Sequence, residues 1–228
     1  DTFRTIGYPG LVALYLVRGL PLAAFPLIQM LLAVLTAYGI FLIGKNFWRA
    51  SVGIFAGLLY LIDPVTIVNT LTIVTDIFYV FLLVWAIYFF FSSQLGQKTA
   101  WALGGLFLGL STLVRPISMF ILIVFFIFYA VKNRRQSIAP IIISLLVYIA
   151  VVSPWVIRNK MVTGVYGIST VKSYNLYHYY IPEFLAYKKG ISASEARIEV
   201  GNGLGVFDER SLGNAAKMEA RAKEFILE

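Results

Sequence analysis

Charged residues in the first 157 positions of this chain stand almost entirely at the ends of long apolar runs. Five runs contain no Asp, Glu, Lys or Arg at all: residues 19–44, 77–97, 99–114, 116–131 and 136–157. A helix needs about 20 apolar residues to cross roughly 30 Å of hydrocarbon, and a charge inside that layer is costly. Runs of this kind, joined by short polar links, predict an all-α, polytopic bundle of transmembrane helices.

The composition excludes an ordinary soluble domain. Hydrophobic residues make up 60% of the 228 residues, charged residues 13%, and the mean hydropathy is +0.83, whereas soluble domains carry about 25% charged residues. The net charge of +8 comes largely from short basic links, as in many membrane proteins, so we expect membrane lipids and no nucleic acid as partners. The absence of cysteine excludes disulfides and thiolate metal sites.

The apolar runs predict about six membrane spans, with a short interfacial helix at residues 10–20 before the first of them. The spans are expected at about residues 22–43, 50–62, 76–91, 99–114, 116–131 and 137–155. Asp63 and Pro64 predict the end of the second span. An apolar link, rich in Thr and β-branched residues, is expected over residues 65–75.

The links between spans fall into two sets that differ in charge. One set contains Lys45, Arg49, Lys98, Lys132, Arg134 and Arg135. The other contains Asp63, Asp76, Arg115 and Arg158. Short links rich in Lys and Arg face the cytoplasm, so the second set is expected on the outer face of the membrane, together with Arg4.

The chain is therefore predicted to have three parts. Residues 1–21 form the end of an outer loop and an interfacial helix, residues 22–156 the bundle, and residues 157–228 a polar, helical extracytoplasmic segment that starts a loop or a soluble domain. Because the chain begins without Met or a signal sequence and stops inside a helical pattern, we expect it to be a fragment of a longer membrane protein.

Three local patterns stand out in the polar segment. Ser192 and Glu195 have the spacing of a capping box, which starts a helix. One face of a helix is predicted by apolar residues at helical spacing: Ala215, Met218, Ala222 and Phe225. A turn is predicted at Gly201, Gly203 and Gly205, since the strand and the Lys of a phosphate loop are missing.

Residues that could carry chemistry gather on the predicted outer face. They are Arg4, Tyr8, Asp63, Asp76, Arg115, Arg158 and Asn159. Of these, Asp63, before Pro64, is more typical of a helix terminator than of a catalytic acid. The planar fork of an Arg suits a phosphate, and a carboxylate among such residues could bind sugar hydroxyls, orient a nucleophile or act as a base. Structural interpretations stand beside these: Asp76 begins a predicted helix, where Asp is favoured without any function, and Arg115 precedes Pro116 at a hairpin tip, where Arg side chains commonly snorkel.

Several segments resemble those of membrane-embedded glycosyltransferases of the C fold (GT-C), in the same order along the chain. Residues 4–10 (RTIGYPG) resemble the R-x-P-G-Y-P segment of the family, with Ile6 in place of its first proline. Further resemblances are found at residues 75–78 (TDIF), 109–116 (GLSTLVRP), 153–159 (SPWVIRN) with Gly164, 173–177 (SYNLY) and the amphipathic stretch 215–228. The nearest groups are the family-39-like, the dolichyl-phosphate-mannose protein mannosyltransferase-like and the aminoarabinose-transferase-like enzymes.

The resemblance implies an enzyme that moves a sugar, with inversion, from a polyprenyl-phosphate carrier to a lipid, glycan or protein acceptor. It would act at the outer face of a bacterial or archaeal cell membrane. Arg4, Arg115 and Arg158 would contact the donor phosphate, Asp76 would be a catalytic acid that shapes the site, and Tyr8 and Asn159 would lie in the same site. The main acid of the family lies in a first outer loop upstream of residue 4, so this fragment alone would be inactive. We predict no cofactor, and the pattern makes no prediction about a divalent metal.

Two other classes fit the hydropathy. A secondary transporter would share the apolar runs and the buried charges, but it would more often show repeated halves and short links on both sides. The polar stretch at residues 183–228 argues against a transporter. A non-catalytic membrane scaffold is the second alternative, and it would tolerate alanine at the Arg and Asp residues of the outer face.

Overall fold

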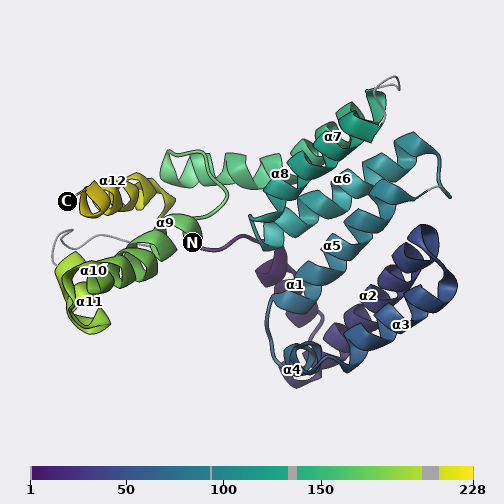
Figure 1. The fold of residues 1–228 in the computed structure, drawn as a ribbon, viewed down its shortest axis with the longest axis horizontal. Helices are drawn as coiled ribbons and strands as arrows, with labels where there is room; N and C mark the ends of the chain where they lie inside the picture. The colour runs from purple at the N-terminus through teal and green to yellow at the C-terminus, as the bar shows by residue number, and fades with distance from the viewer. Residues whose placement is uncertain (1, 93, 133–137, 202–210, 228) are drawn as a thin grey trace. The chain divides into compact units, whose positions relative to one another are not determined.

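The computed structural model describes residues 2–92, 94–132, 138–201 and 211–227 (Figure 1). No strand occurs in these ranges, and the helices fit the predicted all-α membrane bundle. The chain divides into a larger unit, Ile6–Pro154, and a smaller one that joins Asp1–Thr5 to Trp155–Glu228. The predicted three-part division, which refers to membrane boundaries, stays a prediction.

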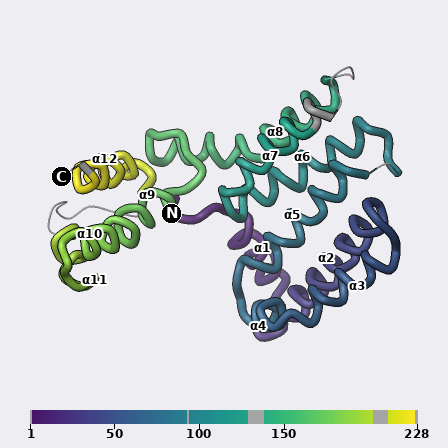
Figure 2. Tube along the Cα trace, viewed as in Figure 1, coloured from purple at the N-terminus to yellow at the C-terminus, as the bar shows by residue number. Residues whose placement is uncertain are grey.

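The larger unit is built from antiparallel helices joined by short turns. Its helices are α1 (Gly7–Val17), α2 (Phe25–Phe47), α3 (Ala50–Ile62), α4 (Pro64–Leu71), α5 (Asp76–Phe91), α6 (Gln97–Val114), α7 (Ser118–Lys132) and the first part of α8 (Ala139–Thr163), with a 3₁₀ turn at Leu22–Ala24. Helix α2 packs on α3 and α5, α5 packs on α6, and α6 packs on α1 and α7 (Figure 2).

The described part of the chain holds two helices long and apolar enough to cross a membrane, Leu22–Phe47 and Ala139–Thr163. Helices α3 and α4, bent by 55° at the break between them, would together make a third. Large apolar side chains are more than half exposed along these helices, among them Leu27, Leu31 and Phe55, as expected of a surface covered by lipid. For the shorter helices, the six-span arrangement stays a prediction.

Helix α4 lies where the sequence predicted only an apolar link. The end of α3 at Ile62 agrees with the predicted span, but Asp63 also starts the next helix, because its Oδ2 accepts a hydrogen bond from the Thr66 N–H at 2.8 Å. Pro64 takes the first helical position, where no N–H is needed. The apolar character of residues 65–75 was recognised in the sequence, but this helix was not, since a cap and a proline outweigh the low helix propensity of Thr and Val.

Helices α2 and α3 pack backbone to backbone through small residues. A Cβ added at Gly53 would lie within 3.0 Å of the Phe41 carbonyl oxygen, and one at Gly57 would lie 2.9 Å from the carbonyl oxygen of Ala37. Small residues four positions apart, such as Gly53 and Gly57, are typical of helix pairs in membranes. Close packing holds such helices together, because the hydrophobic effect does not act between helices in lipid.

We expect Gly53→Ala to destabilise the α2–α3 pair. The new methyl group meets backbone rather than a movable side chain, so overpacking of about 1–3 kcal/mol outweighs the helix-propensity gain of about 0.5–1 kcal/mol. Thermal unfolding of the protein in detergent micelles measures the difference. Gly10→Ala in α1 is the control, because its Cβ would only touch the Ile6 side chain at 3.6 Å; equal midpoints for the two variants would contradict the close packing.

The smaller unit is a cluster of short helices. They are the end of α8, α9 (Val171–Asn175), a π-helical turn (Leu176–Tyr180), α10 (Ile181–Lys189), α11 (Ala193–Gly201), a 3₁₀ turn (Leu212–Asn214) and α12 (Ala215–Leu227). The N-terminal residues belong to it: the Thr2 carbonyl accepts from the Thr170 N–H at 3.2 Å, and the Thr2 hydroxyl accepts from the Leu212 N–H at 2.9 Å.

Two local predictions for this unit are confirmed. Ser192 Oγ accepts from the Glu195 N–H at 3.2 Å and Glu195 Oε2 accepts from the Ser192 N–H at 2.9 Å, which is the reciprocal pattern of a capping box. The predicted apolar face of α12 supplies buried core residues, namely Met218, Ala222 and Phe225. Of the predicted turn, Gly201 is the last residue of α11, while Gly203 and Gly205 lie outside the described residues, as do Arg134 and Arg135.

A buried hydroxyl connects α9 to α12. Ser173 Oγ donates to Glu219 Oε1 at 2.8 Å, and Lys172 Nζ lies 3.4 Å from the same oxygen. The hydrogen bond from Ser173, aided by the charge of Lys172, lowers the pKa of Glu219 below the ordinary Glu value of 4.5. The pKa of Glu219 is lower in the folded than in the unfolded state, so its carboxylate stabilises the fold at pH values above the unfolded-state pKa. This stabilisation is lost as the pH falls through the folded-state pKa.

Ser173→Ala should therefore weaken the protection of α12 near neutral pH and flatten its loss with falling pH, because the variant lacks the hydrogen bond that stabilises the Glu219 carboxylate. Hydrogen exchange of the peptides that cover Ala215–Leu227, followed by mass spectrometry between about pH 3 and pH 7 around the Glu titration, measures this. Ser194→Ala, which removes an exposed hydroxyl from α11, is the control. Identical pH profiles for the two variants would show that Ser173 does not stabilise the Glu219 carboxylate.

Candidate functional site

Two predicted site residues form an ion pair at one end of the larger unit. Asp76 is the first residue of α5, and Arg115 follows the last residue of α6 in extended backbone, with Pro116 after it. Arg115 Nη2 lies 2.7 Å from Asp76 Oδ2, and the two side chains are 41% and 39% exposed. The pair is therefore both formed and accessible, as a site for a charged ligand requires.

Neighbouring side chains hold the Arg115 guanidinium from two further directions. Thr75 Oγ1 accepts from Arg115 Nη2 at 3.1 Å and from Nε at 3.4 Å. The guanidinium carbon lies 5.2 Å from the centre of the Tyr79 ring, a cation–π distance, and the Tyr79 hydroxyl accepts from Ser118 Oγ at 3.3 Å. The hydrogen bonds from Arg115 to Thr75 run through Nη2 and Nε, which leaves the N–H groups of Nη1 as donors for a phosphate.

Tyr8 comes to the same end of the unit through close packing of α1 on α6. A Cβ at Gly7 would lie 2.5 Å from the Leu113 carbonyl oxygen, so the start of α1 touches the end of α6 just before Arg115. The Tyr8 ring is 7% exposed, and its hydroxyl donates to Gln29 Oε1 at 3.0 Å. Tyr8 thus lies beneath the site rather than open at its surface.

Gln29 is a residue that reasoning from the sequence missed. It lies in α2, is 1% exposed, and contacts both Tyr8 and the link between α4 and α5. The signal that could have found it is its position: a strongly polar side chain inside the charge-free run 19–44. Polar residues inside membrane spans are costly and commonly functional.

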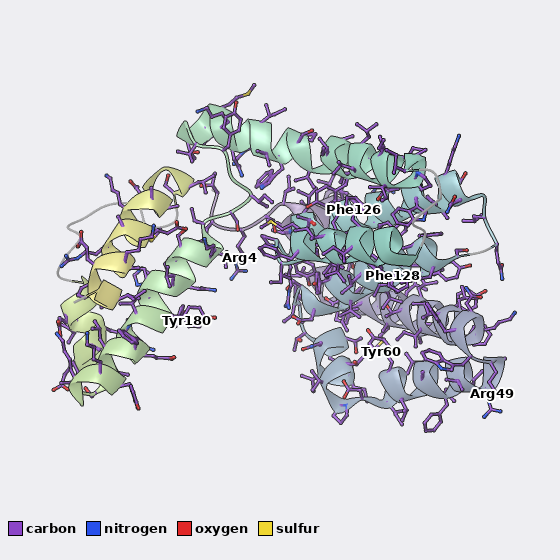
Figure 3. The ribbon with its side chains drawn as sticks, turned by 45° about the horizontal axis from the view of Figure 1, so that its top comes forward. Arg4, Arg49, Tyr60, Phe126, Phe128 and Tyr180 are labelled. Atoms are coloured by element: carbon purple, nitrogen blue, oxygen red, sulfur yellow. The ribbon has the colours of Figure 1, made fainter. Side chains whose placement is uncertain are left out.

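The remaining predicted site residues belong to the smaller unit. Arg158 Nη1 donates to Asn159 Oδ1 at 3.0 Å, and the guanidinium lies 4.9 Å from the centre of the Trp155 ring. Asn159 is fully buried and its Nδ2 donates to the carbonyl oxygens of Gly167 and Ile168 at 2.9 and 3.3 Å. Arg4 is exposed on the N-terminal segment (Figure 3).

The structure thus brings together Asp76 and Arg115 in one unit and Arg158 and Asn159 in the other. Any approach of Arg4, Arg158 and Asn159 to the Asp76–Arg115 pair stays a prediction. Asp63, also expected on the outer face, serves as the cap of α4. In the described ranges, no group of three or more His, Asp or Glu residues could hold a metal ion.

The accessible Asp76–Arg115 pair should contribute little to stability. Ion pairs with this exposure are worth about 1 kcal/mol or less, because water and salt screen the two charges. A double-mutant cycle with Asp76→Asn and Arg115→Gln, measured by unfolding in detergent, is expected to give a coupling of at most about 1 kcal/mol. A coupling several times larger would mean that the pair holds the fold together instead of serving a ligand.

A comparison with protein families assigns most of the chain to a known family. The model of the family described as dolichyl-phosphate-mannose-protein mannosyltransferase matches residues 11–157, well over half of the chain. No curated protein and no solved structure matches the chain. The matched range contains Asp76 and Arg115, while Arg4, Tyr8, Arg158 and Asn159 lie outside it.

Proposed function

The chain belongs to the dolichyl-phosphate-mannose-protein mannosyltransferase family, and from this membership we propose that it transfers a sugar, with inversion, at the outer face of its membrane. The family supports an integral membrane glycosyltransferase with a polyprenyl-phosphate-linked sugar as donor. The observation that carries the proposal is the accessible Asp76–Arg115 pair inside the matched range. Membership also favours an enzyme over the transporter and scaffold alternatives.

In the proposed reaction, an acceptor hydroxyl attacks the anomeric carbon from the side opposite the phosphate. The new bond from carbon to acceptor oxygen forms as the bond to the phosphate oxygen breaks, and the bonding electrons leave with the polyprenyl phosphate. The acceptor proton passes to a general base, for which the family resemblance points to an acid upstream of residue 4. The acceptor is a lipid, a glycan or a protein, and the membrane is a bacterial or archaeal cell membrane.

Arg115 is the proposed contact to the leaving phosphate. Negative charge grows on that phosphate as the bond breaks, so a cation already in place stabilises the transition state more than the ground state. Asp76, Thr75 and the Tyr79 ring hold the guanidinium in one orientation, which spares the cost of ordering it during the reaction.

Asp76 has two proposed roles. Its Oδ2 holds Arg115, and its Oδ1 is proposed to accept a hydrogen bond from a hydroxyl of the sugar or the acceptor. Arg4 and Arg158 are proposed as further phosphate contacts, with Asn159 orienting Arg158 and Tyr8 supporting the site from below.

The test is sugar transfer from a polyprenyl-phosphate donor by the full-length protein in lipid nanodiscs. Arg115→Ala should lower the rate by about 10²–10³-fold, the loss typical of removing one transition-state charge contact, without reducing the yield of folded protein. Arg115→Lys should fall between, because Lys keeps the charge but lacks the planar fork.

Arg49→Ala is the matched control. Arg49 is an exposed Arg at the turn between α2 and α3, at the end of these helices away from α4 (Figure 3), and its loss should leave the rate unchanged. Normal transfer by Arg115→Ala would remove Arg115 from the site. Failure of the unaltered protein to use any polyprenyl-phosphate-linked sugar would overturn the proposed function itself.

A further inference from the structure

Gln29 makes an unusual set of hydrogen bonds for a side chain inside a membrane helix. Its Nε2 donates to the carbonyl oxygens of Asn69 and Thr72, each at 2.7 Å, with the Thr70 carbonyl at 3.5 Å. Its Oε1 accepts from the Tyr8 hydroxyl at 3.0 Å. The opposite orientation of the amide would set an oxygen against carbonyl oxygens, so the partners define which atom lies where.

The carbonyl groups that Gln29 contacts belong to the C-terminal end of α4. The last carbonyls of a helix have no N–H partner within it, and in an apolar layer each unpaired group is costly. Asn69 and Thr70 lie in the last turn of α4, and Thr72 is the residue that ends it. The Thr72 carbonyl also accepts from the Val74 N–H at 3.0 Å, so the Gln29 amide shares in completing the end of α4 and joins it to α2.

The link that begins at Thr72 leads directly into the candidate site. Three residues further on, Thr75 accepts from Arg115, and Asp76 pairs with it. Because the α4–α5 link is so short, the position of Thr72 limits where Thr75 and Asp76 can lie. The same amide also holds Tyr8, on the helix that packs against the end of α6 just before Arg115.

We propose that Gln29 is a positioning residue, which sets the α4–α5 link, and with it Thr75 and Asp76, around the Arg115 guanidinium. It touches neither donor nor acceptor. The effect of Gln29 on sugar transfer rests on the proposed function. Its positioning of the α4–α5 link does not.

Thr36 shows that a buried polar side chain in α2 can find its hydrogen-bond acceptor within its own helix. It lies seven residues after Gln29, is also fully buried, and its hydroxyl donates to the Leu32 carbonyl within the same helix at 2.7 Å. Thr36→Val is therefore a matched control, because it removes a buried hydroxyl whose hydrogen bond goes to its own helix rather than to the α4–α5 link.

Mobility of the link is the first readout. The 228-residue sequence has no cysteine, so Ile73→Cys, at an exposed position of the link, gives one site in it for a nitroxide label. In the full-length protein in nanodiscs, Gln29→Leu should give a clearly more mobile spectrum at position 73, and Thr36→Val an unchanged one. Gln29→Glu should also loosen the link, because a carboxyl group donates at most one hydrogen bond where the amide donates two, whereas Tyr8→Phe should leave the link in place.

Steady-state sugar transfer, normalised to folded protein, is the second readout. Gln29→Leu is expected to lower kcat at least about tenfold, with the donor KM changed less than about threefold, because misplaced groups act mainly in the transition state. Thr36→Val should stay near the unaltered protein in both constants. An equal loss in the two variants would reduce Gln29 to a stabilising residue and overturn the proposal.

An unchanged label spectrum in Gln29→Leu would also overturn it, whatever the activity. The label spectrum needs no substrate, so it tests whether Gln29 holds the α4–α5 link even if the protein transfers no sugar. Loss of transfer in the unaltered protein, with a mobilised link in Gln29→Leu, would instead count against the proposed function and leave the positioning of the link supported.

Discussion

Hydrocarbon offers no hydrogen bonds, and this constraint governs the larger unit. Backbone groups there must find partners within the chain, which is why its described residues are helices joined by short turns. Side chains help to complete both ends of α4: Asp63 caps its start, and Gln29 donates to carbonyls at its end. Thr36 returns its hydroxyl to its own helix. The polar groups of these three side chains are therefore already engaged in the fold.

Close packing supplies what the hydrophobic effect cannot supply between helices in lipid. Gly53 brings α3 onto the backbone of α2, and Gly7 brings α1 onto the end of α6. Aromatic rings fill the remaining interior, as where Phe90 stacks on Phe125 at 4.4 Å and meets the edge of Trp101 at 5.1 Å. These contacts decide which helix ends meet, and so which charged residues become neighbours.

The candidate site lies where helices end because charge is tolerated there. Asp76 at the start of α5 and Arg115 after α6 pair across a short gap, with Tyr79 beneath the guanidinium. The arrangement combines the two interpretations that the sequence left open: Asp76 begins a helix and also takes part in the accessible charge pair. A structural role in the fold and a proposed role in phosphate stabilisation are thus carried by the same side chain.

Local and periodic features could be predicted from the sequence alone. The bounds of α3 and α5, the capping box at Ser192 and the buried face of α12 depend on nearby residues, and the structure confirms them. Only the tertiary structure decided the ion pair of Asp76 with Arg115 and the contacts of Gln29 with residues 40 to 43 positions away. Pairs so distant along the chain meet through the packing of whole helices, which depends on shape and side-chain fit and leaves no periodic trace in the sequence.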